Sequence, residues 1–257
     1  MDIIIKKAKP MGNSASVYVP KEWKNKKVVV RLLSSKELIL DVLQPWMANI
    51  IGVYLYGSYA RGDEQEDSDI DVLVVTNHKI KVDYSKPLDM VVITQDELEL
   101  ILKDDPIQLM PIVMESQPVV NEAYLEKLKT IKVNPRQYLK LVRENEKKLR
   151  TYKLMITDKV HLDAIVYSLM LRLRAIYLVN LLLSNKKYST ADFQKYITEL
   201  GIERESYENL YKIYRCVRDN RELPEKVITL EEILQLYDLL GKENQKLERR
   251  LKNAKKE

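Results

Sequence analysis

The sequence predicts an α+β multidomain protein built from three parts. Residues 1–41 would form a small β domain, residues 42–130 a central mixed β-sheet with flanking helices, and residues 131–257 an antiparallel helical bundle. Three observations support this division. Short segments alternate apolar and polar residues near the start, β-branched runs separated by helix signals follow, and apolar residues recur at helical spacing from Asn134-Pro135 onward.

Composition limits the class of protein. The 257 residues are 46% hydrophobic and 32% charged, which suits folded domains with real cores. The single cysteine, Cys216, excludes an internal disulfide framework and favours a reducing cytoplasm. No signal peptide is evident, and the longest apolar run, 176–183, is flanked by Arg172 and Arg174. We therefore expect a cytoplasmic protein that does not span a membrane.

The net charge of +5 is concentrated at the N-terminus. Residues 1–36 carry nine Lys or Arg and two acidic side chains, a net charge of +7, so the remaining residues sum to −2. A localised basic patch suits a polyanionic partner such as DNA. A basic edge that only maintains solubility explains the same charge equally well.

The first forty residues indicate short strands and turns. Residues 14–19 alternate apolar and polar side chains after a turn at residues 10–13. Residues 27–33 and 37–41 are predicted to pair as a hairpin across Ser34-Ser35. A piece of this size buries little surface alone and needs a partner surface.

The segments GNSASVYVPKEW and KKVVVRLL resemble the AbrB-like swapped-hairpin DNA-binding domains, in particular their short archaeal versions. The resemblance covers about residues 3–41. It implies that two chains interleave their hairpins into a homodimer with a basic face toward DNA. The alternative is a small β addition that docks on the chain's own central domain.

The stretch YGSYARGDEQEDSDIDVLVV, which begins at Tyr56, carries the first chemical signal. Residues 52–56 are predicted as a strand, and Gly57 lets the backbone approach a ligand closely. Ser58 then opens a short helix that ends at Gly62. Amide groups at a helix start and a serine hydroxyl suit phosphate oxygens.

Acidic residues follow at strand spacing. Residues 69–75 are predicted as a strand, which places Asp69 and Asp71 on one face. Asp89 precedes a third predicted strand, Met90 to Ile93. Adjacent carboxylates repel each other unless a cation lies between them, and oxygen ligands suit Mg²⁺ shared with substrate phosphates. Three acids could hold two metal ions.

This arrangement resembles the nucleotidyltransferase superfamily typified by DNA polymerase β. The residues GSYARGD and EDSDIDVLVV are especially similar to those of the minimal nucleotidyltransferases. The resemblance covers about residues 45–125. The matching motif positions are Gly57, Ser58, Asp69, Asp71 and Asp89. It implies Mg²⁺-dependent transfer of a nucleoside monophosphate, with release of pyrophosphate, and it implies that the Gly-Ser pair holds the triphosphate.

The same resemblance implies roles for the acids. Asp69 and Asp71 would be catalytic metal ligands, and Asp89 would bind a metal ion and assist deprotonation of the acceptor. Arg61 is either a further phosphate contact or an exposed helix charge. Tyr59 stands where many relatives have Arg, so one phosphate contact is missing or comes from elsewhere.

The C-terminal half reads as helices joined by short turns, which predicts antiparallel packing. The expected helices cover residues 135–155, 160–183, 189–200, 205–218 and a last one from Leu230 that frays toward Glu257. Antibiotic (kanamycin) nucleotidyltransferases carry such a helical domain. The HEPN ribonuclease signature, an Arg and a His separated by four to six residues, is absent at both His78 and His161, so a fused HEPN nuclease is not expected, whereas a degenerate HEPN-like bundle is the alternative.

Two groups of side chains in this half have two interpretations each. The polar residues of the apolar second helix form either an internal network or part of the catalytic cleft: His161, Asp163, Arg172 and Arg174. Tyrosines at spacings of four and three form either a core stripe or a platform for bases: Tyr207, Tyr211 and Tyr214. The nearby arginines are either a solvated helix end or a contact for nucleotide or RNA: Arg215, Arg218 and Arg221.

Two functions follow from these observations. The first is an enzyme that transfers a nucleoside monophosphate, by default AMP from ATP, to a hydroxyl of a protein, an RNA or a small molecule. The likeness to minimal nucleotidyltransferase antitoxins favours a protein acceptor. The second is a DNA-binding regulator or antitoxin whose nucleotidyltransferase domain senses a nucleotide or is inactive.

Overall fold

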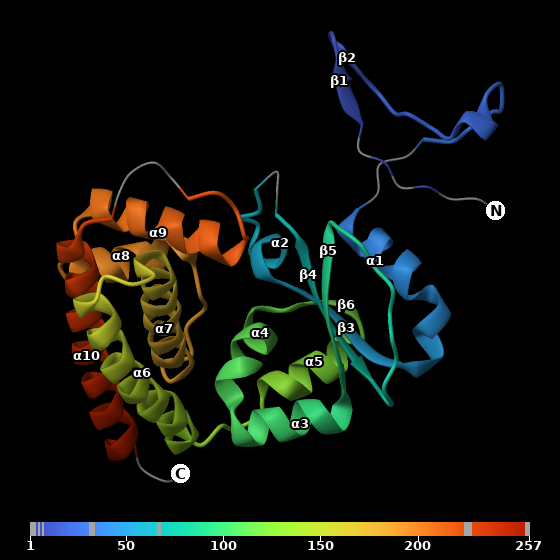
Figure 1. Ribbon diagram of the computed structural model, residues 1–257. Helices are drawn as coiled ribbons and strands as arrows, with labels where there is room; N and C mark the ends of the chain where they lie inside the picture. Colours follow the sequence, from blue (N-terminus) through green and yellow to red (C-terminus); the bar gives the residue numbers. More distant parts are fainter. Residues whose placement is uncertain are drawn as a thin grey trace. The chain divides into compact units, whose positions relative to one another are not determined.

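The computed structural model in Figure 1 describes residues 4, 6, 8–30, 34–65, 68–223 and 228–254. The chain divides into two units, Met1–Leu38 and Ile39–Glu257, and each is considered by itself. The second unit contains both the sheet and the helical bundle. A domain boundary near residue 130 within it stays a prediction.

The first unit contains a short antiparallel hairpin. Strand β1 (Lys9–Met11) pairs with β2 (Ser14–Ser16), and Gly12 turns the chain at φ 60°. A single 3-10 turn, η1, follows at Lys21–Trp23. The predicted turn is present at residues 12–13, although β1 includes residues 10 and 11, which were predicted as part of that turn. Strand β2 is shorter than the strand predicted for residues 14–19, and most of a strand expected over residues 2–8 lies outside the described part of the chain.

The hairpin predicted across Ser34-Ser35 is wrong. Helix α1 (Ser35–Leu43) begins there instead. The Glu37 carboxylate accepts hydrogen bonds from Ser34 N at 2.9 Å and Ser34 Oγ at 3.1 Å, and Glu37 N donates to Ser34 Oγ at 3.3 Å. These contacts form a capping box, which favours a helix start over a β-turn. Residues 27–30 are not in a strand, and residues 31–33 lie outside the described part of the chain.

The second unit begins with the predicted mixed sheet, whose strand order is β5-β4-β3-β6. Strand β3 (Ile50–Tyr56) runs antiparallel to both β4 (Ile70–Thr76) and the edge strand β6 (Gln117–Val120). Strand β5 (Leu88–Thr94) runs parallel to β4. The fold class predicted for this region is confirmed.

Helices flank this sheet and close its core. They are η2 (Gln44–Asn49), α2 (Gly57–Arg61), α3 (Gln95–Asp104), η3 (Pro106–Gln108), α4 (Met110–Glu115) and α5 (Glu122–Lys129). Tyr54 and Leu73 of the sheet pack against Leu98 of α3, Val113 of α4 and Leu125 of α5. All five side chains are fully buried. This packing fixes β3 and β4, the strands that lead into and out of the Gly-Ser turn.

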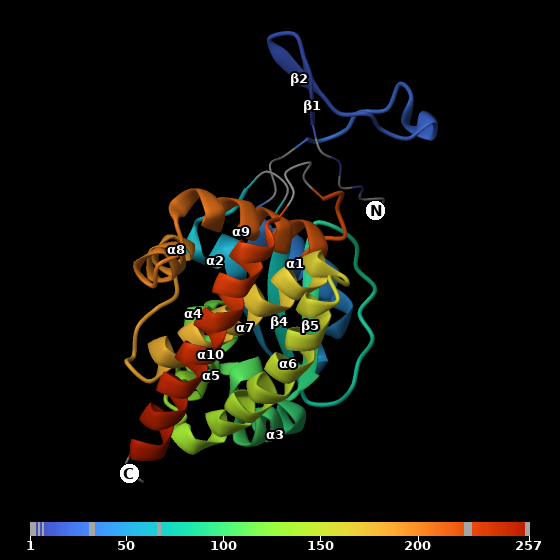
Figure 2. The ribbon, with the colours of Figure 1, turned by 60° about the vertical axis from the view of Figure 1, so that its left-hand side comes forward.

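The C-terminal helices form the predicted bundle. After the turn η4 (Pro135–Tyr138) come α6 (Leu139–Thr157), α7 (Leu162–Leu182), α8 (Thr190–Glu199), α9 (Arg204–Arg218) and α10 (Leu230–Asn253). Helix α7 packs against α6, α9 and α10, and α10 lies along α6 (Figure 2). Helix α10 continues to Asn253, with Leu247 and Leu251 buried in the core, and the fraying predicted toward Glu257 falls on residues 255–257, outside the described part of the chain.

Helix α7 matches the helix predicted for residues 160–183 and includes most of the apolar run at residues 176–183. Among the described residues, α7 is the one helix whose length and composition would allow it to cross a membrane, and its mean hydropathy is 1.6. The central helix of a folded bundle has the same character. Val166, Leu169 and Leu173 are fully buried between the neighbouring helices.

A polar network crosses the interior of the bundle. Arg172 donates to Tyr152 Oη at 3.2 Å and to Asn145 Oδ1 at 2.7 Å. Asn145 Nδ2 donates in turn to Asn244 Oδ1 at 2.9 Å, and Asn244 bonds to the carbonyl of Val142. Buried polar groups need such partners. Of the two interpretations of Arg172, the internal network is confirmed.

Candidate active site

Three side chains line up across neighbouring strands at one end of the sheet. Tyr56 of β3 is in register with Asp71 of β4, and Asp71 is in register with Asp89 of β5. Residues in register on adjacent strands, roughly 4.8 Å apart, point to the same face. The structure therefore brings together two of the three predicted carboxylates.

The third acid, Asp69, lies just before β4 begins. Its carboxylate is 3.4 Å from the ammonium group of Lys86, and its side chain is 38% exposed. Among the residues that the structure describes, no three His, Cys, Asp or Glu side chains are arranged to hold a metal ion. Metal binding by Asp69, Asp71 and Asp89 thus stays a prediction.

The electrostatics of Asp71 are those of a crowded carboxylate. Burial is the main cause that raises its pKa from 3.8 to about 6, and the carboxylates of Asp89, Asp69 and Glu115 raise it further. Arg61 acts in the opposite direction. The ionised form is therefore disfavoured in the protein alone, and a bound cation would relieve that cost. This donor chemistry fits a divalent metal ion.

Thermal stability measured as a function of pH tests the raised pKa of Asp71. The pKa of Asp71 is higher in the folded protein than in the unfolded chain, so the folded state binds this proton more tightly. The resulting stabilisation is fully present below about pH 4 and is lost as pH rises through about 6. In chelator-treated protein, Asp71→Asn should remove this loss. We expect the variant to gain thermal stability relative to the parent between pH 4.5 and 7.5, on the order of several degrees. If the melting temperatures of the two proteins changed with pH in the same way across that range, the raised pKa of Asp71 would be contradicted.

Gly57 brings the predicted phosphate turn into contact with the acids. It begins α2 directly after β3, at φ 70°. A Cβ atom added here would lie 2.0 Å from Asp71 Oδ2, so no side chain fits. Gly62 ends α2 at φ 73°, as predicted. The Gly-Ser turn and Asp71, separated by a loop in the sequence, are direct neighbours in the fold.

Arg61 is paired, which differs from the exposed helix charge considered above. Its side chain is 17% exposed and lies 2.8 Å from Glu115 Oε2 and 3.3 Å from Asp63. Burial, the largest single influence, lowers the pKa of Arg61, but the nearby carboxylates of Glu115 and Asp63 together raise it above its usual value. A phosphate contact from Arg61 stays a prediction.

Sequence reasoning missed Glu115. Its carboxylate accepts a hydrogen bond from Gly57 N at 3.2 Å as well as the contact from Arg61. One signal was available, because Glu115 is the only charged residue between Asp105 and Glu122. A lone acid in an apolar segment usually has a specific partner.

The bundle contributes to the surroundings of Arg61. The ring of Tyr188, in the loop between α7 and α8, has the guanidinium of Arg61 at 5.4 Å and that of Arg174 at 4.9 Å. Thr190 Oγ1 donates to Asp63 Oδ2 at 3.2 Å. The loop thus contacts the C-terminal end of α2, and the first residue of α8 contacts the segment after α2.

The tyrosine stripe of α9 belongs to the core. Tyr207 and Tyr214 are each 3% exposed, and both stack on Tyr211 with ring centroids 5.5 and 5.7 Å apart. Arg218 pairs with Asp219 at 2.6 Å. The core interpretation of the stripe is confirmed for these two tyrosines.

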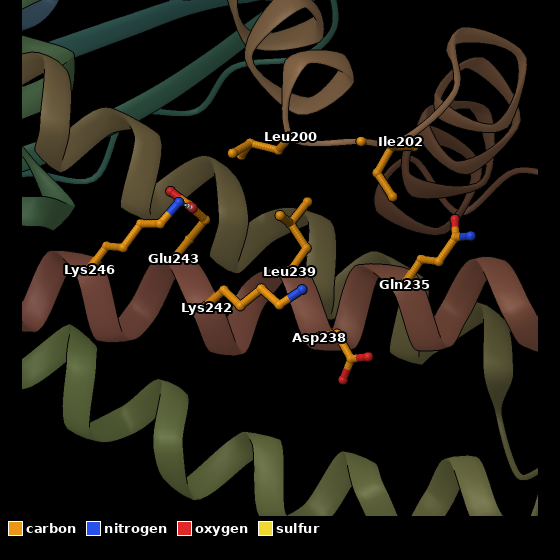
Figure 3. Close-up of a pocket in the computed structure, with 9 residues that line it drawn as sticks. Leu200, Ile202, Gln235, Asp238, Leu239, Lys242, Glu243 and Lys246 are labelled. Carbon is orange, nitrogen blue, oxygen red and sulfur yellow. Dashed lines mark hydrogen bonds and ion pairs between the residues drawn. The ribbon is translucent and has the colours of Figure 1, made fainter.

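A hollow of about 300 Å³ in the bundle shares no residue with this site. It lies between α10 and the turn after α8, and Figure 3 shows Leu200, Ile202 and Leu239 around it with Lys242. The buried Glu243 at its edge is paired with Lys246 at 2.6 Å and accepts from Tyr196 Oη. We assign no chemistry to this hollow.

Comparison with protein families decides the nature of the central domain. Residues 37–137 match the family described as polymerase beta, nucleotidyltransferase. The central domain is a nucleotidyltransferase domain. This nucleotidyltransferase domain contains the predicted site, from Gly57 to Asp89, together with Glu115.

Two other comparisons concern the N-terminal segment and the whole chain. Residues 1–35 match a family described as putative transposon-encoded protein (DUF2080), and the AbrB-like resemblance stays a prediction. None of the curated proteins matches the chain.

Two solved structures are similar to this chain. The spectinomycin adenyltransferase AAD(9) from Enterococcus faecialis, crystallised with ATP and spectinomycin, is 15% identical, with a TM-score of 0.49 over 82% of this chain and 96% of that one. A nucleotidyltransferase-like protein from Exiguobacterium sibiricum is 12% identical, with a TM-score of 0.38 over 83% and 75% of the two chains.

Proposed function

We propose that the chain is a Mg²⁺-dependent enzyme that transfers a nucleoside monophosphate, by default AMP from ATP, to an acceptor hydroxyl and releases pyrophosphate. The observation that carries this proposal is the contact between Gly57 and Asp71, with Asp89 in register beside Asp71, inside a nucleotidyltransferase domain. The phosphate turn and the acids are adjacent, as such a reaction requires.

The chain's own groups have separable tasks in this proposal. The amide groups at the start of α2 and the Ser58 hydroxyl orient the triphosphate. Asp89 accepts the proton of the acceptor hydroxyl, whose oxygen forms a bond to the α-phosphorus while the bond to pyrophosphate breaks. Asp69, Asp71 and Asp89 would hold Mg²⁺, which supplies neutralisation of the charge on the phosphates when it is bound.

The acceptor is most usefully sought among proteins first, because the motif resembles the minimal nucleotidyltransferase antitoxins. RNA ends and small molecules are the other acceptor classes. Incubation with each labelled nucleoside triphosphate, with and without Mg²⁺, should give metal-dependent release of pyrophosphate. If no donor binds in a metal-dependent way and none is consumed, the proposal fails.

The basic N-terminal segment favours a second function, binding of duplex DNA by a homodimer. Residues 1–36 carry a net charge of +7. Lys24, Lys26 and Lys27 are exposed in the first unit. Replacing all three with Glu should abolish DNA binding by the full chain, because phosphate contacts provide most of such affinity.

Mobility-shift titrations at several salt concentrations measure this effect. The parent should bind with an affinity that falls steeply with salt, and light scattering should give twice the chain mass. A matched control replaces Lys147, Lys148 and Lys153, which are exposed on α6, with Glu and should bind DNA like the parent. If the parent itself ignores DNA at low salt, the DNA-binding proposal is wrong.

A further inference from the structure

We propose that Glu115 is a positioning residue that holds helix α2, and with it the Gly57-Ser58 turn, in the geometry that binds the triphosphate. The inference rests on the proposed function and deepens it. It assigns a role in nucleotide binding to the junction of α4 and β6, a segment in which the sequence showed no chemistry.

Helix α2 needs outside support because it has only five residues, Gly57–Arg61. A single turn of helix is not stable by itself in water. The Glu115 carboxylate contacts both ends of this helix. Its Oε1 accepts from Gly57 N at 3.2 Å, and its Oε2 accepts from Arg61 Nη1 at 2.8 Å. One side chain therefore fixes the first and the last residue of the helix that carries the Gly-Ser turn.

A second contact comes from the same segment. Gln117 Nε2 donates to the carbonyl oxygen of Ala60 in α2. Gln117 also begins β6 and is paired with Leu55 of β3. Glu115 and Gln117, which we call the brace, thus connect α2 to the edge strand of the sheet. A displacement of α2 would have to break contacts to two residues of the brace.

The environment screens the ion pair of the brace less than it would screen a surface pair. The side chains of Glu115 and Arg61 are 16% and 17% exposed. Exposed pairs contribute little because water and salt screen them, whereas shielded pairs are screened much less. Asp63 and the ring of Tyr188 hold the other sides of the Arg61 guanidinium. Glu115 therefore binds an Arg61 side chain whose position Asp63 and Tyr188 already restrict.

If Glu115 competed with phosphate instead of positioning α2, its removal would change the affinity for nucleotide in the opposite direction. The groups that Glu115 contacts, an amide at the start of α2 and a guanidinium, are also those predicted to meet a phosphate. If Glu115 only competed with phosphate for these groups, its removal would strengthen nucleotide binding. If it positions them, its removal weakens binding. The direction of the change in dissociation constant distinguishes the two roles.

The experiment measures the dissociation constant of ATP with Mg²⁺ for the full chain and its variants, well below each thermal midpoint. We expect Glu115→Ala to weaken binding about tenfold, as loss of a hydrogen bond to a charged group does. Glu115→Gln should bind with intermediate affinity, because its amide oxygen can still accept from Gly57 N while its amide nitrogen cannot accept from Arg61. The control Glu122→Gln removes the same charge from an exposed position on α5 and should bind like the parent.

Gln117→Ala provides a milder variant should Glu115→Ala fail to fold, and it should weaken ATP binding severalfold. Tighter binding by the Glu115 variants would overturn the inference in favour of competition. A lowered thermal midpoint with unchanged ATP affinity would overturn it in favour of a purely structural role. If the parent binds no nucleotide with Mg²⁺, the proposed function fails and this inference fails with it.

Discussion

Replacing Asp71 with Asn is expected to lower nucleotidyl transfer about a thousandfold while the chain stays folded. Asp71 is the carboxylate in contact with the Gly57 backbone and in register with Asp89. Charge stabilisation by a metal ion at such a position contributes several kcal/mol in the transition state, and each 1.36 kcal/mol changes the rate about tenfold. The amide keeps the shape of the side chain but loses the charge.

Steady-state release of pyrophosphate measures this effect. Asp238→Asn is a suitable control because Asp238 is exposed on α10 in the bundle, and this variant should retain the parent's rate. The thermal midpoint of Asp71→Asn without metal should be no lower than that of the parent, since the substitution removes a crowded charge. A variant that is folded and fully active would exclude Asp71 from the reaction.

Gly57→Ala should lower activity at least a hundredfold and destabilise the chain. The added Cβ would lie 2.0 Å from Asp71 Oδ2, so either α2 or the Asp71 carboxylate must move. The residue would also have to hold φ 70°, which costs roughly 1–2 kcal/mol for a residue with a side chain. A displacement of about 1 Å at a reacting centre can cost two orders of magnitude in rate.

Gly62→Ala separates these two effects. Gly62 has φ 73°, but a Cβ atom added there meets nothing within 4 Å. The variant should show a similar loss of stability from backbone strain and almost unchanged activity. Chemical denaturation and pyrophosphate release, measured on both variants, make the comparison. Equal activities for the two variants would mean that contact with Asp71 is irrelevant to the reaction.

Much of the arrangement of the candidate site could be predicted because its signals are local. The spacing from Gly57 to Asp71 indicates a strand, a turn and a second strand, and those strands are β3 and β4. Helices α3 and α10 begin with capping boxes, formed by Thr94 with Glu97 and by Thr229 with Glu232, and a pattern of two residues three positions apart is visible in the sequence. Asp89 required one further step, the pairing of β5 with β4, and the structure shows that pairing.

The rest depends on tertiary contacts that no local pattern encodes. Glu115 reaches Gly57 and Arg61 from 58 and 54 residues away. Tyr188 contacts Arg61 only because the loop between α7 and α8 lies beside the end of α2. The error at Ser34 had another origin, since two serines suit a turn and a helix cap alike, and the choice depended on Glu37.

Nucleotidyl transfer by the chain is tested most directly by comparing ATP labelled at the α-phosphate with ATP labelled at the γ-phosphate. Each is incubated with Mg²⁺, the full chain and a mixture of proteins and RNA as acceptors, with Asp71→Asn in parallel. We predict that the α-label alone becomes attached to an acceptor, that the γ-label leaves as pyrophosphate, and that Asp71→Asn does neither. Transfer of the γ-label, or equal transfer by Asp71→Asn, would contradict the proposal.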